Sequence, residues 1–142
     1  ELSAHENVVG VKDSRGDLSD VGELTQRCRE GFQVLVGNGA IVYGALEVGA
    51  VGGVLGVANL APGASAGIVQ AFAAGRAAEA GRLQERVGPL HKRVVGGLGV
   101  PGVKAGLDLL GMRGGDPRPP LLPLDESGRS EVEAALMQAG LL

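Results

Sequence analysis

Three short apolar runs, each followed by a turn and a helical segment, constrain this chain to a parallel α/β fold. The runs lie at Val8 to Val11, at Phe32 to Val36 and at about Gly53 to Val57. Helical segments of about ten residues are expected between and after them. Parallel strands require such crossovers, and the crossovers are right-handed in almost all known cases. The sequence therefore predicts three parallel strands joined by helices.

The first run ends in a lysine. The stretch from Asn7 to Asp17 reads N-V-V-G-V-K-D-S-R-G-D, which is typical of a strand buried on both faces with Lys12 at its C-terminal end. That end of the strands carries the chemistry in parallel α/β folds. An amine lodged among apolar walls loses the hydration of its ammonium form, which leaves more free amine to attack a carbonyl. The pattern leaves two interpretations open, a Schiff-base lysine and a lysine that simply reaches solvent, and the strand by itself favours the second.

Capping and breaking residues place the helices. Asp17 or Ser19 can cap a first helix that runs to about Arg29, and Gly114 to Pro123 is expected to be an extended strap because it holds four prolines and two glycines. A flexible bend is expected at 96–102. Further helices are expected over Ala40 to Val48, Ala64 to Ala74, Arg76 to Val95, Val103 to Leu110, and from about Ser127 to the end.

Composition excludes several classes of protein. Apolar residues make up 44% of the 142 residues, which fits a globular domain, and only 2% are aromatic, so the core must be built from Val, Leu and Ala. A net charge of -3 gives no basic footprint for nucleic acid. The single cysteine, Cys28, rules out an internal disulfide and suits a reducing cytoplasm, and no Cys/His spacing typical of a metal site accompanies it.

Two other interpretations are weaker. Gly37-Asn38-Gly39 invites comparison with a dinucleotide-binding fingerprint, but Val42 stands where the third glycine is needed. The run from Ala40 to Ala61 holds one charge, Glu47, and its length approaches that of a membrane span. The glycines of this run favour a buried helix followed by a buried strand. We therefore expect no membrane insertion, and the missing third glycine makes nucleotide binding a weak interpretation.

A resemblance extends over the whole chain. V-G-V-K-D-S-R-G-D continues into F-Q-V-L-V-G-N-G at 32–39, G-G-V-L-G-V-A-N at 52–59, G-V-P-G-V-K at 99–104 and S-G-R-S-E-V-E-A-A-L-M-Q-A-G-L-L at 127–142. In this order the segments resemble the dihydrodipicolinate synthase and N-acetylneuraminate lyase family of class I Schiff-base aldolases, particularly members similar to 4-hydroxy-2-oxoglutarate aldolase and dihydrodipicolinate synthase.

The resemblance implies an incomplete barrel. A complete (β/α)8 barrel takes about 250 residues, and strands one to five of the family have no counterpart here. The implied fold is α/β, the C-terminal part (about three strands) of a (β/α)8 TIM barrel followed by a C-terminal helical appendage. Residues 1–75 would form the partial barrel and residues 76–142 the helical region.

The resemblance also implies the chemistry. Lys12 would be the nucleophile that attacks the keto carbon of pyruvate or a related 2-oxo acid, and an aldehyde would be the second partner, with no metal or organic cofactor. Gly37 and Asn38 would lie beside the substrate, and Leu55, at the end of the third strand, would offer backbone near the carboxylate or the imine. Gly39 stands where some members have an acidic residue. This difference weakens the assignment as a synthase and leaves the assignment as an aldolase open. A cytoplasmic homo-oligomer, dimer or tetramer, is expected.

Two functions remain open for the chain itself. The family's carboxylate-binding loop and proton-shuttling tyrosine belong to earlier strands, whereas Tyr43 falls in a helix and is assigned to packing, and His5 and His91 to structural roles. The chain is therefore expected to be part of a Schiff-base lyase that is complete only with an N-terminal half. The alternative is a catalytically inactive half-barrel with a structural or oligomerisation role, because open sheet edges favour self-association.

Overall fold

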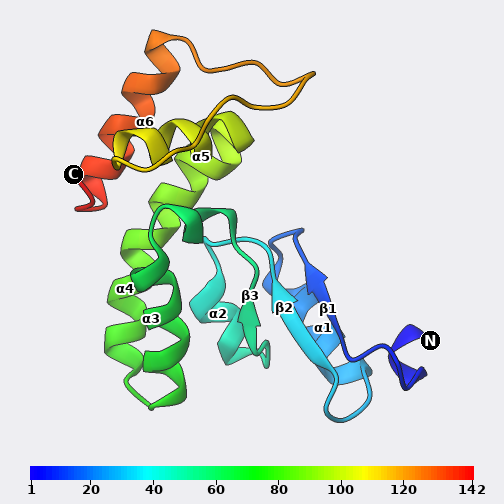
Figure 1. The fold of residues 1–142 in the computed structure, drawn as a ribbon. Coiled ribbons are helices and arrows are strands. Elements are labelled where there is room, and N and C mark those ends of the chain that lie inside the picture. The colour runs from blue at the N-terminus through cyan, green and yellow to red at the C-terminus, as the bar shows by residue number, and fades with distance from the viewer.

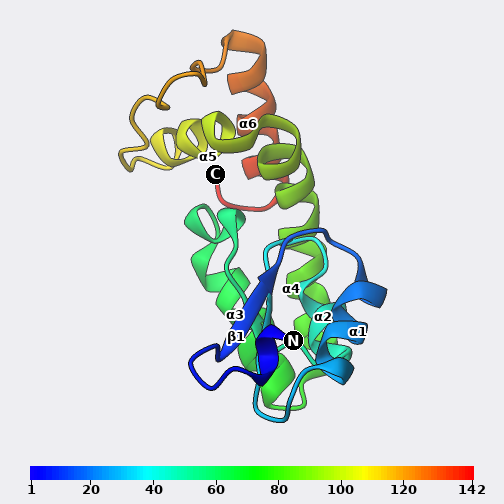
Figure 2. The same cartoon turned by 90° about the vertical axis from the view of Figure 1, so that its right-hand side faces the viewer.

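A three-stranded parallel sheet and a set of C-terminal helices make up the molecule (Figures 1 and 2). The computed structural model describes all of residues 1–142. In chain order the elements are the 3-10 helix η1 (Leu2–Ala4), β1 (Gly10–Asp13), α1 (Leu18–Arg27), β2 (Gln33–Val36), α2 (Val42–Glu47), β3 (Gly52–Gly53), the 3-10 helix η2 (Gly56–Asn59), α3 (Pro62–Ala73), α4 (Ala77–Leu90), the π-helix η3 (His91–Gly97), α5 (Leu98–Leu109) and α6 (Glu126–Gln138).

The sheet has the order β1-β2-β3, and both pairs are parallel as predicted. Lys12 is paired with Leu35 and Asp13 with Val36, while Val36 in turn is paired with Gly53. The three arrows in Figure 1 point toward the end of the molecule that carries α5 and α6. The C-terminal ends of all three strands therefore meet at one edge of the sheet.

Helices cover only one face of this sheet. Val34 and Val36 of β2 are buried, whereas Leu35 between them is only half-buried. Because side chains alternate across a strand, Val34 and Val36 point toward the helical layer and Leu35 toward the other side. The core consists only of Val, Leu, Ile and Ala, as the low aromatic content predicts. The face that carries Leu35 is left open.

The first strand is less buried than predicted. The side chains of Val9 and Val11 are 65% and 38% exposed, and Lys12 is exposed as well. The prediction of a strand buried on both faces is wrong because β1 is the edge of the sheet and pairs only with β2. Its second edge has no neighbouring strand.

The N-terminal cap of α1 is confirmed. The Asp17 carboxylate accepts hydrogen bonds from the backbone N–H groups of Ser19 and Asp20 at 2.7 and 3.2 Å. These bonds satisfy two of the N–H groups that have no partner within the helix. The α6 cap differs from the prediction, since Asp125, and not the serine-rich stretch after it, accepts from Gly128 N–H at 2.8 Å.

The third strand is shorter than predicted. Its ladder ends with the bond from Val54 N–H to the Val36 carbonyl at 2.9 Å. Gly56 to Asn59 then form η2, whose Val57 is fully buried. A run of apolar residues that ends a strand and enters a 3-10 turn gives the same sequence pattern as a longer strand, which explains the difference.

Helices α3 and α4 form a hairpin that packs on α2, beside the sheet (Figure 1). Helix α4 and the start of η3 bury one side, which carries Ala80, Val87, Leu90 and His91. Leu83 is half-buried. The helix does not run unchanged to Val95, however, since it becomes π-helical from His91 onward. Where a bend was predicted, α5 is kinked at Gly99, whose φ of 62° lies in the left-handed region.

An irregular arm joins α5 to α6, as predicted for the proline-rich strap. It is the orange segment that projects beyond α5 in Figures 1 and 2. Lys104 Nζ donates a hydrogen bond to the Gly114 carbonyl at 2.7 Å, which ties the start of the arm to α5. Helix α6 packs on α5 through Val132, Ala135 and Leu136. None of the helices combines the length and the apolar character that a membrane crossing requires.

Candidate active site

Lys12 lies at the C-terminal edge of the sheet, on the face that the helices leave open. Its neighbour Val11 lines a cavity together with Leu24 and Cys28 of the α1 region. Because successive side chains of a strand point to opposite faces, Lys12 points away from α1. The lysine thus occupies the side of the sheet that would be the interior of a closed barrel.

Gly37 lies beside the Lys12 side chain, directly after the adjacent strand β2. A β-carbon at Gly37 would come within 2.6 Å of Lys12 Cε and within 2.2 Å of Ser14 Oγ. The backbone N–H of Gly37 donates to the Asp13 carbonyl at 2.7 Å, which continues the strand pairing past β2. The absence of a side chain at Gly37 therefore makes room for Lys12.

Asn38 lies in the same loop and contacts the loop after β1. Its Oδ1 accepts a hydrogen bond from Ala40 N–H at 2.9 Å, and its Nδ2 would lie 2.3 Å from a β-carbon on Gly16. Gly16 has a φ of +83°, which glycine adopts without strain. The loops that follow β1 and β2 are therefore packed directly on each other, and Lys12, Gly37 and Asn38 are brought together.

Leu55 is placed differently from the prediction. It is not at the end of a strand, because β3 ends at Gly53 and Leu55 forms the N-terminal cap position of η2. Its side chain packs near Gly53, where a β-carbon would lie 2.8 Å from Leu55 Cδ2. Leu55 thus lies beyond the same edge of the sheet as Lys12 and Gly37, in extended backbone.

Asp13 anchors the loop that follows Lys12. It is buried, and it accepts from Arg15 N–H at 2.9 Å and from Arg15 Nε at 2.7 Å. Arg15 also pairs with Asp20 of α1 at 2.9 Å. Burial alone would raise the pKa of the Asp13 carboxyl, but the hydrogen bonds and charge of Arg15 and the Gly16 N–H outweigh it and hold that pKa below its ordinary value. The carboxylate serves as a structural anchor for the turn.

Two residues from α4 and η3 also contact the loop at Gly37 to Gly39. His91 Nδ1 accepts from Gly39 N–H at 3.2 Å, and Gln84 Nε2 donates to the Gly39 carbonyl at 2.9 Å. Burial lowers the pKa of the His91 imidazole. The sequence interpretation gave His91 a structural role and did not consider Gln84, because these partners are 52 and 45 positions away from Gly39 and no local pattern joins them.

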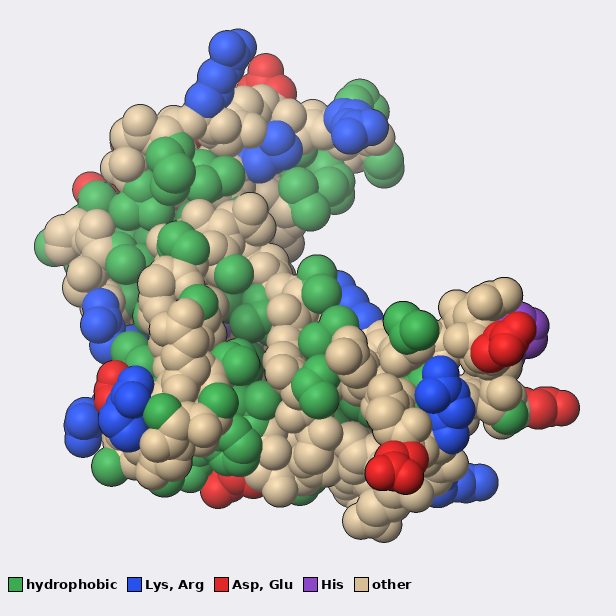
Figure 3. All heavy atoms as spheres, turned by 60° about the horizontal axis from the view of Figure 1, so that its bottom comes forward, with side chains coloured by type: hydrophobic (Ala, Val, Ile, Leu, Met, Phe, Trp, Pro, Cys, Tyr) green, Lys and Arg blue, Asp and Glu red, His purple; other side chains and the backbone are tan.

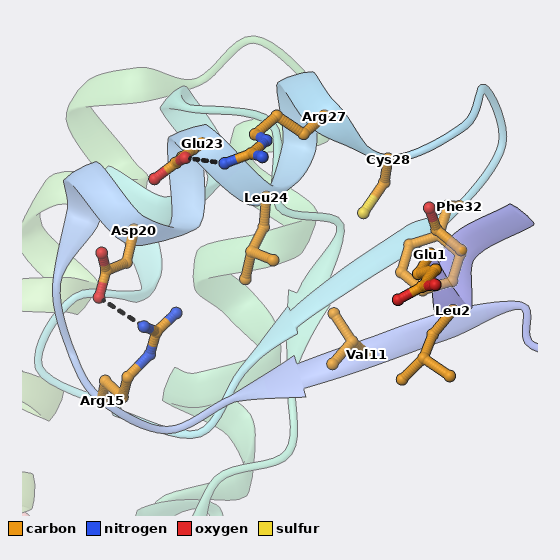
Figure 4. A pocket seen from close by; sticks show the side chains of 11 residues that line it. Glu1, Leu2, Val11, Arg15, Asp20, Glu23, Leu24, Arg27, Cys28 and Phe32 are labelled. Atoms are coloured by element: carbon orange, nitrogen blue, oxygen red, sulfur yellow. Dashed lines mark hydrogen bonds and ion pairs between the residues drawn. The ribbon is translucent and has the colours of Figure 1, made fainter.

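A cavity of about 660 Å³ lies on the other face of β1, between that strand and α1 (Figure 4). The close-up shows Val11, Leu24 and Phe32 directed toward it, with the Arg15–Asp20 ion pair at one end and the Glu23–Arg27 pair on α1. Cys28 is half-buried in its wall. The cavity lies on the face of β1 that carries Val11, and Lys12 does not line it.

Hydrophobic side chains also gather along the concave side of the molecule, between the helical region and the strands (Figure 3). No three His, Cys, Asp or Glu side chains come together in a way that could hold a metal ion.

One protein family matches nearly the whole length of the chain. The Dihydrodipicolinate synthetase family matches residues 1–139. The chain belongs to this family. The resemblance inferred from the sequence segments is therefore confirmed.

The chain is similar to synthases of this family. The chain is 36% identical over 142 residues to the 4-hydroxy-tetrahydrodipicolinate synthase of Jannaschia sp. (strain CCS1), covering all of this chain and 49% of that protein. It is 39% identical over 140 residues to the synthase of Rhizobium meliloti (strain 1021), covering 98% of this chain and 48% of that protein. The chain thus spans about half the length of the curated relatives it matches.

Solved structures agree with this fold. The dihydrodipicolinate synthase of Thermotoga maritima superposes with a TM-score of 0.85 at 28% identity, covering 99% of this chain and 49% of that one. The 4-hydroxy-tetrahydrodipicolinate synthase of Methylacidiphilum fumariolicum SolV gives a TM-score of 0.86 at 29% identity, covering 95% and 45%. The chain is therefore a partial TIM barrel of the dihydrodipicolinate synthase fold, with three parallel strands, as expected.

Proposed function

We propose that this chain carries the nucleophile and one wall of a Schiff-base lyase or synthase site that acts on pyruvate or a related 2-oxo acid. The observation that carries the proposal is the position of Lys12, at the C-terminal end of β1 and directly over Gly37. This is the edge of a parallel sheet at which barrel enzymes place their chemistry. The family match over residues 1–139 and the likeness to 4-hydroxy-tetrahydrodipicolinate synthases support the assignment.

The reaction follows from the lysine amine. Lys12 Nζ attacks the keto carbon of the 2-oxo acid, and loss of one water leaves an iminium ion. That cation accepts the electron pair left when a proton or a neighbouring carbon–carbon bond is removed from the adjacent carbon, and the product is an enamine. The enamine can then attack an aldehyde, which gives the synthetic direction. Gly37 and Asn38 would border the bound acid, and the Leu55 backbone would lie near its carboxylate or the imine.

A complete site requires further residues. Lys12 is exposed on the open face, and the chain spans about half the length of its relatives. The free edge of β1 and the cavity beside it are suited to the strand and helix that precede β1 in a closed barrel. We therefore assign the activity to this chain combined with an N-terminal half, since positioning supplies much of the rate in such reactions.

Borohydride trapping tests the proposal. The chain is incubated with pyruvate and sodium borohydride, alone and fused behind the N-terminal half of the Jannaschia synthase, and its mass is measured. A reduced imine adds one pyruvate less one water plus two hydrogens, and peptide mapping should place it on Lys12. Lys12→Ala should abolish the adduct. Lys104→Ala is the matched control and should leave it unchanged, because Lys104 is occupied with the Gly114 carbonyl.

The structural alternative rests on the exposed edge of β1. Val9 and Val11 present apolar surface beside unpaired backbone, which favours association with another chain. If neither the chain nor the fusion is trapped, the Schiff-base proposal fails and the half-barrel role in oligomerisation is favoured. An adduct spread over several lysines would also contradict the proposal, since it would reflect non-specific imine formation.

A further inference from the structure

Gly39 is buried, and side chains from one helical segment bind both of its backbone polar groups. Its N–H donates to His91 Nδ1 at 3.2 Å, and its carbonyl accepts from Gln84 Nε2 at 2.9 Å. Gln84 lies in the middle of α4, and His91 is the first residue of η3. The backbone N–H and carbonyl of Gly39 have no partner in a strand or a helix, and two side chains that are distant in the sequence supply the hydrogen bonds instead.

Gln84 extends this connection into α2. Its Oε1 accepts from Tyr43 N–H at 2.9 Å, near the start of that helix. The amide therefore donates to Gly39 and accepts from Tyr43 at the same time. Since Tyr43 N–H is among the helix-start donors that have no partner within the helix, Gln84 fixes the loop and the helix that follows it together.

The packing around Gly39 leaves little freedom. A β-carbon there would lie 2.6 Å from Val57 Cγ1 and 3.1 Å from His91 Nδ1. Gly39 is two residues from Gly37, over which Lys12 passes, and next to Asn38, which contacts Gly16. A shift of Gly39 would consequently move the loop that borders the lysine.

We propose that His91 and Gln84 are positioning residues that hold the Gly37–Gly39 loop against Lys12 from outside the partial barrel. The inference rests on the proposed Schiff-base function and explains what the helical appendage contributes to it. Neither side chain touches the reacting atoms. They act through Gly39, and the appendage and the site form one structural unit.

The chemistry of the imidazole makes the proposal specific. Because His91 Nδ1 accepts a hydrogen bond, the ring must be neutral with its proton on Nε2. The Asn side chain places its Oδ1 at about the position of His Nδ1, so His91→Asn keeps an acceptor there. His91→Phe keeps a planar ring without one. Gln84→Glu keeps the acceptor for Tyr43 N–H and replaces the donor to Gly39 with a second acceptor.

The first test is independent of catalysis. In ¹⁵N NMR spectra of the 142-residue chain, His91 should have an unprotonated Nδ1, and the Gly39 amide should exchange slowly with solvent. His91→Phe should raise the exchange rate of that amide by at least about 10-fold, and His91→Asn should restore most of the protection. Val94→Ala is the matched control. It removes packing from the same π-helix without touching Gly39 and should leave the Gly39 amide protected.

The second test uses the trapping-competent fusion. His91→Phe and Gln84→Glu should each lower kcat/KM for pyruvate by about 10- to 100-fold, because a loop displaced by about 1 Å costs that much. Val94→Ala should lower the free energy of unfolding but keep kcat/KM within about 3-fold of the wild type. This difference from His91→Phe would show that the loss of activity comes from a displaced loop and not from general destabilisation. His91→Asn should recover most of the activity.

The two tests separate the failure of each proposal. If wild-type Lys12 is not trapped while the Gly39 amide depends on His91 as expected, the Schiff-base function fails and the loop-positioning contact stands. If trapping works but His91→Phe, His91→Asn and Val94→Ala all behave alike in both tests, the positioning role is overturned. A protonated Nδ1 in the folded chain would overturn it directly.

Discussion

The side chain of Lys12 passes across Gly37, so close that a β-carbon on Gly37 would come within 2.6 Å of Lys12 Cε. The same β-carbon would lie 2.2 Å from Ser14 Oγ. Both contacts are to side-chain atoms of the β1 strand end, and neither is to backbone. An added methyl group would therefore displace the lysine more readily than it would unfold the sheet.

Gly37→Ala should consequently reduce Schiff-base trapping in the fusion by about 10-fold or more while lowering the free energy of unfolding by only about 1–2 kcal/mol. Trapping rate and urea unfolding measure the two effects. Gly81→Ala in α4 is the control, because its β-carbon would meet nothing within 4 Å. It should stabilise the helix by about 1 kcal/mol and leave trapping unchanged. An unchanged trapping rate in Gly37→Ala would mean that Lys12 does not need this space.

Asp13 should make the free energy of unfolding depend on pH in the acidic range. The folded-state pKa of Asp13 is below the ordinary 3.8, so the folded chain binds fewer protons than the unfolded chain around that pH. The stabilisation from Asp13 is therefore fully present well above pH 3.8 and is lost as the pH falls through the lower folded value. Asp13→Asn should flatten this part of the pH profile.

Urea midpoints measured from neutral pH to below pH 3.8 check this expectation. Glu133→Gln, at an exposed position of α6, is the matched control for the removal of one carboxylate. Equal slopes in Asp13→Asn and the wild type would show that Arg15 does not hold the folded-state pKa of Asp13 down.

The strands and the lysine could be predicted from sequence because their signals are local. Apolar β-branched runs and turn residues located β1 and β2, and Asp17 marked the start of α1. The short β3 could not be distinguished from a longer strand, since the residues that leave the sheet at Leu55 are as apolar as those within it. Edge exposure at Val11 depends on which strands are neighbours, and the strand's own composition does not encode that.

Some contacts of the candidate site could be predicted from the sequence, and others depend on the tertiary structure. The resemblance placed Lys12 and Gly37 in one region, and the structure brings them together. His91 and Gln84 reach Gly39 only because the α3–α4 hairpin folds back beside the sheet. That contact is a consequence of tertiary structure, and no spacing within the sequence could have predicted it.

Helix α6 should be required for the fold of the helical region. Leu136 is fully buried between α6 and its neighbours, so Leu136→Ala should lower the free energy of unfolding by about 2–5 kcal/mol. Met137 is 62% exposed on the same helix, and Met137→Ala should cost less than about 0.5 kcal/mol. Chemical unfolding compares the two. Similar losses would mean that α6 does not pack on α5 as described.

The free edge of β1 should control self-association of the isolated chain. Val9 and Val11 are 65% and 38% exposed beside unpaired strand backbone, and the cavity behind Val11 offers further apolar surface. Lysines at an edge oppose strand pairing with another molecule, since their charge would have to be buried. The double variant Val9→Lys/Val11→Lys should therefore raise the dissociation constant for self-association by about 10-fold or more.

Light scattering and sedimentation over a range of concentrations measure this change. Val48→Lys/Val100→Lys carries the same added charge at positions that are 37% and 52% exposed on other elements, so it separates an edge effect from general charge repulsion. If both double variants dissociate equally, the association surface lies elsewhere. If the wild-type chain is monomeric at all concentrations, the predicted association through the β1 edge is wrong, and the oligomerisation role that rests on it fails.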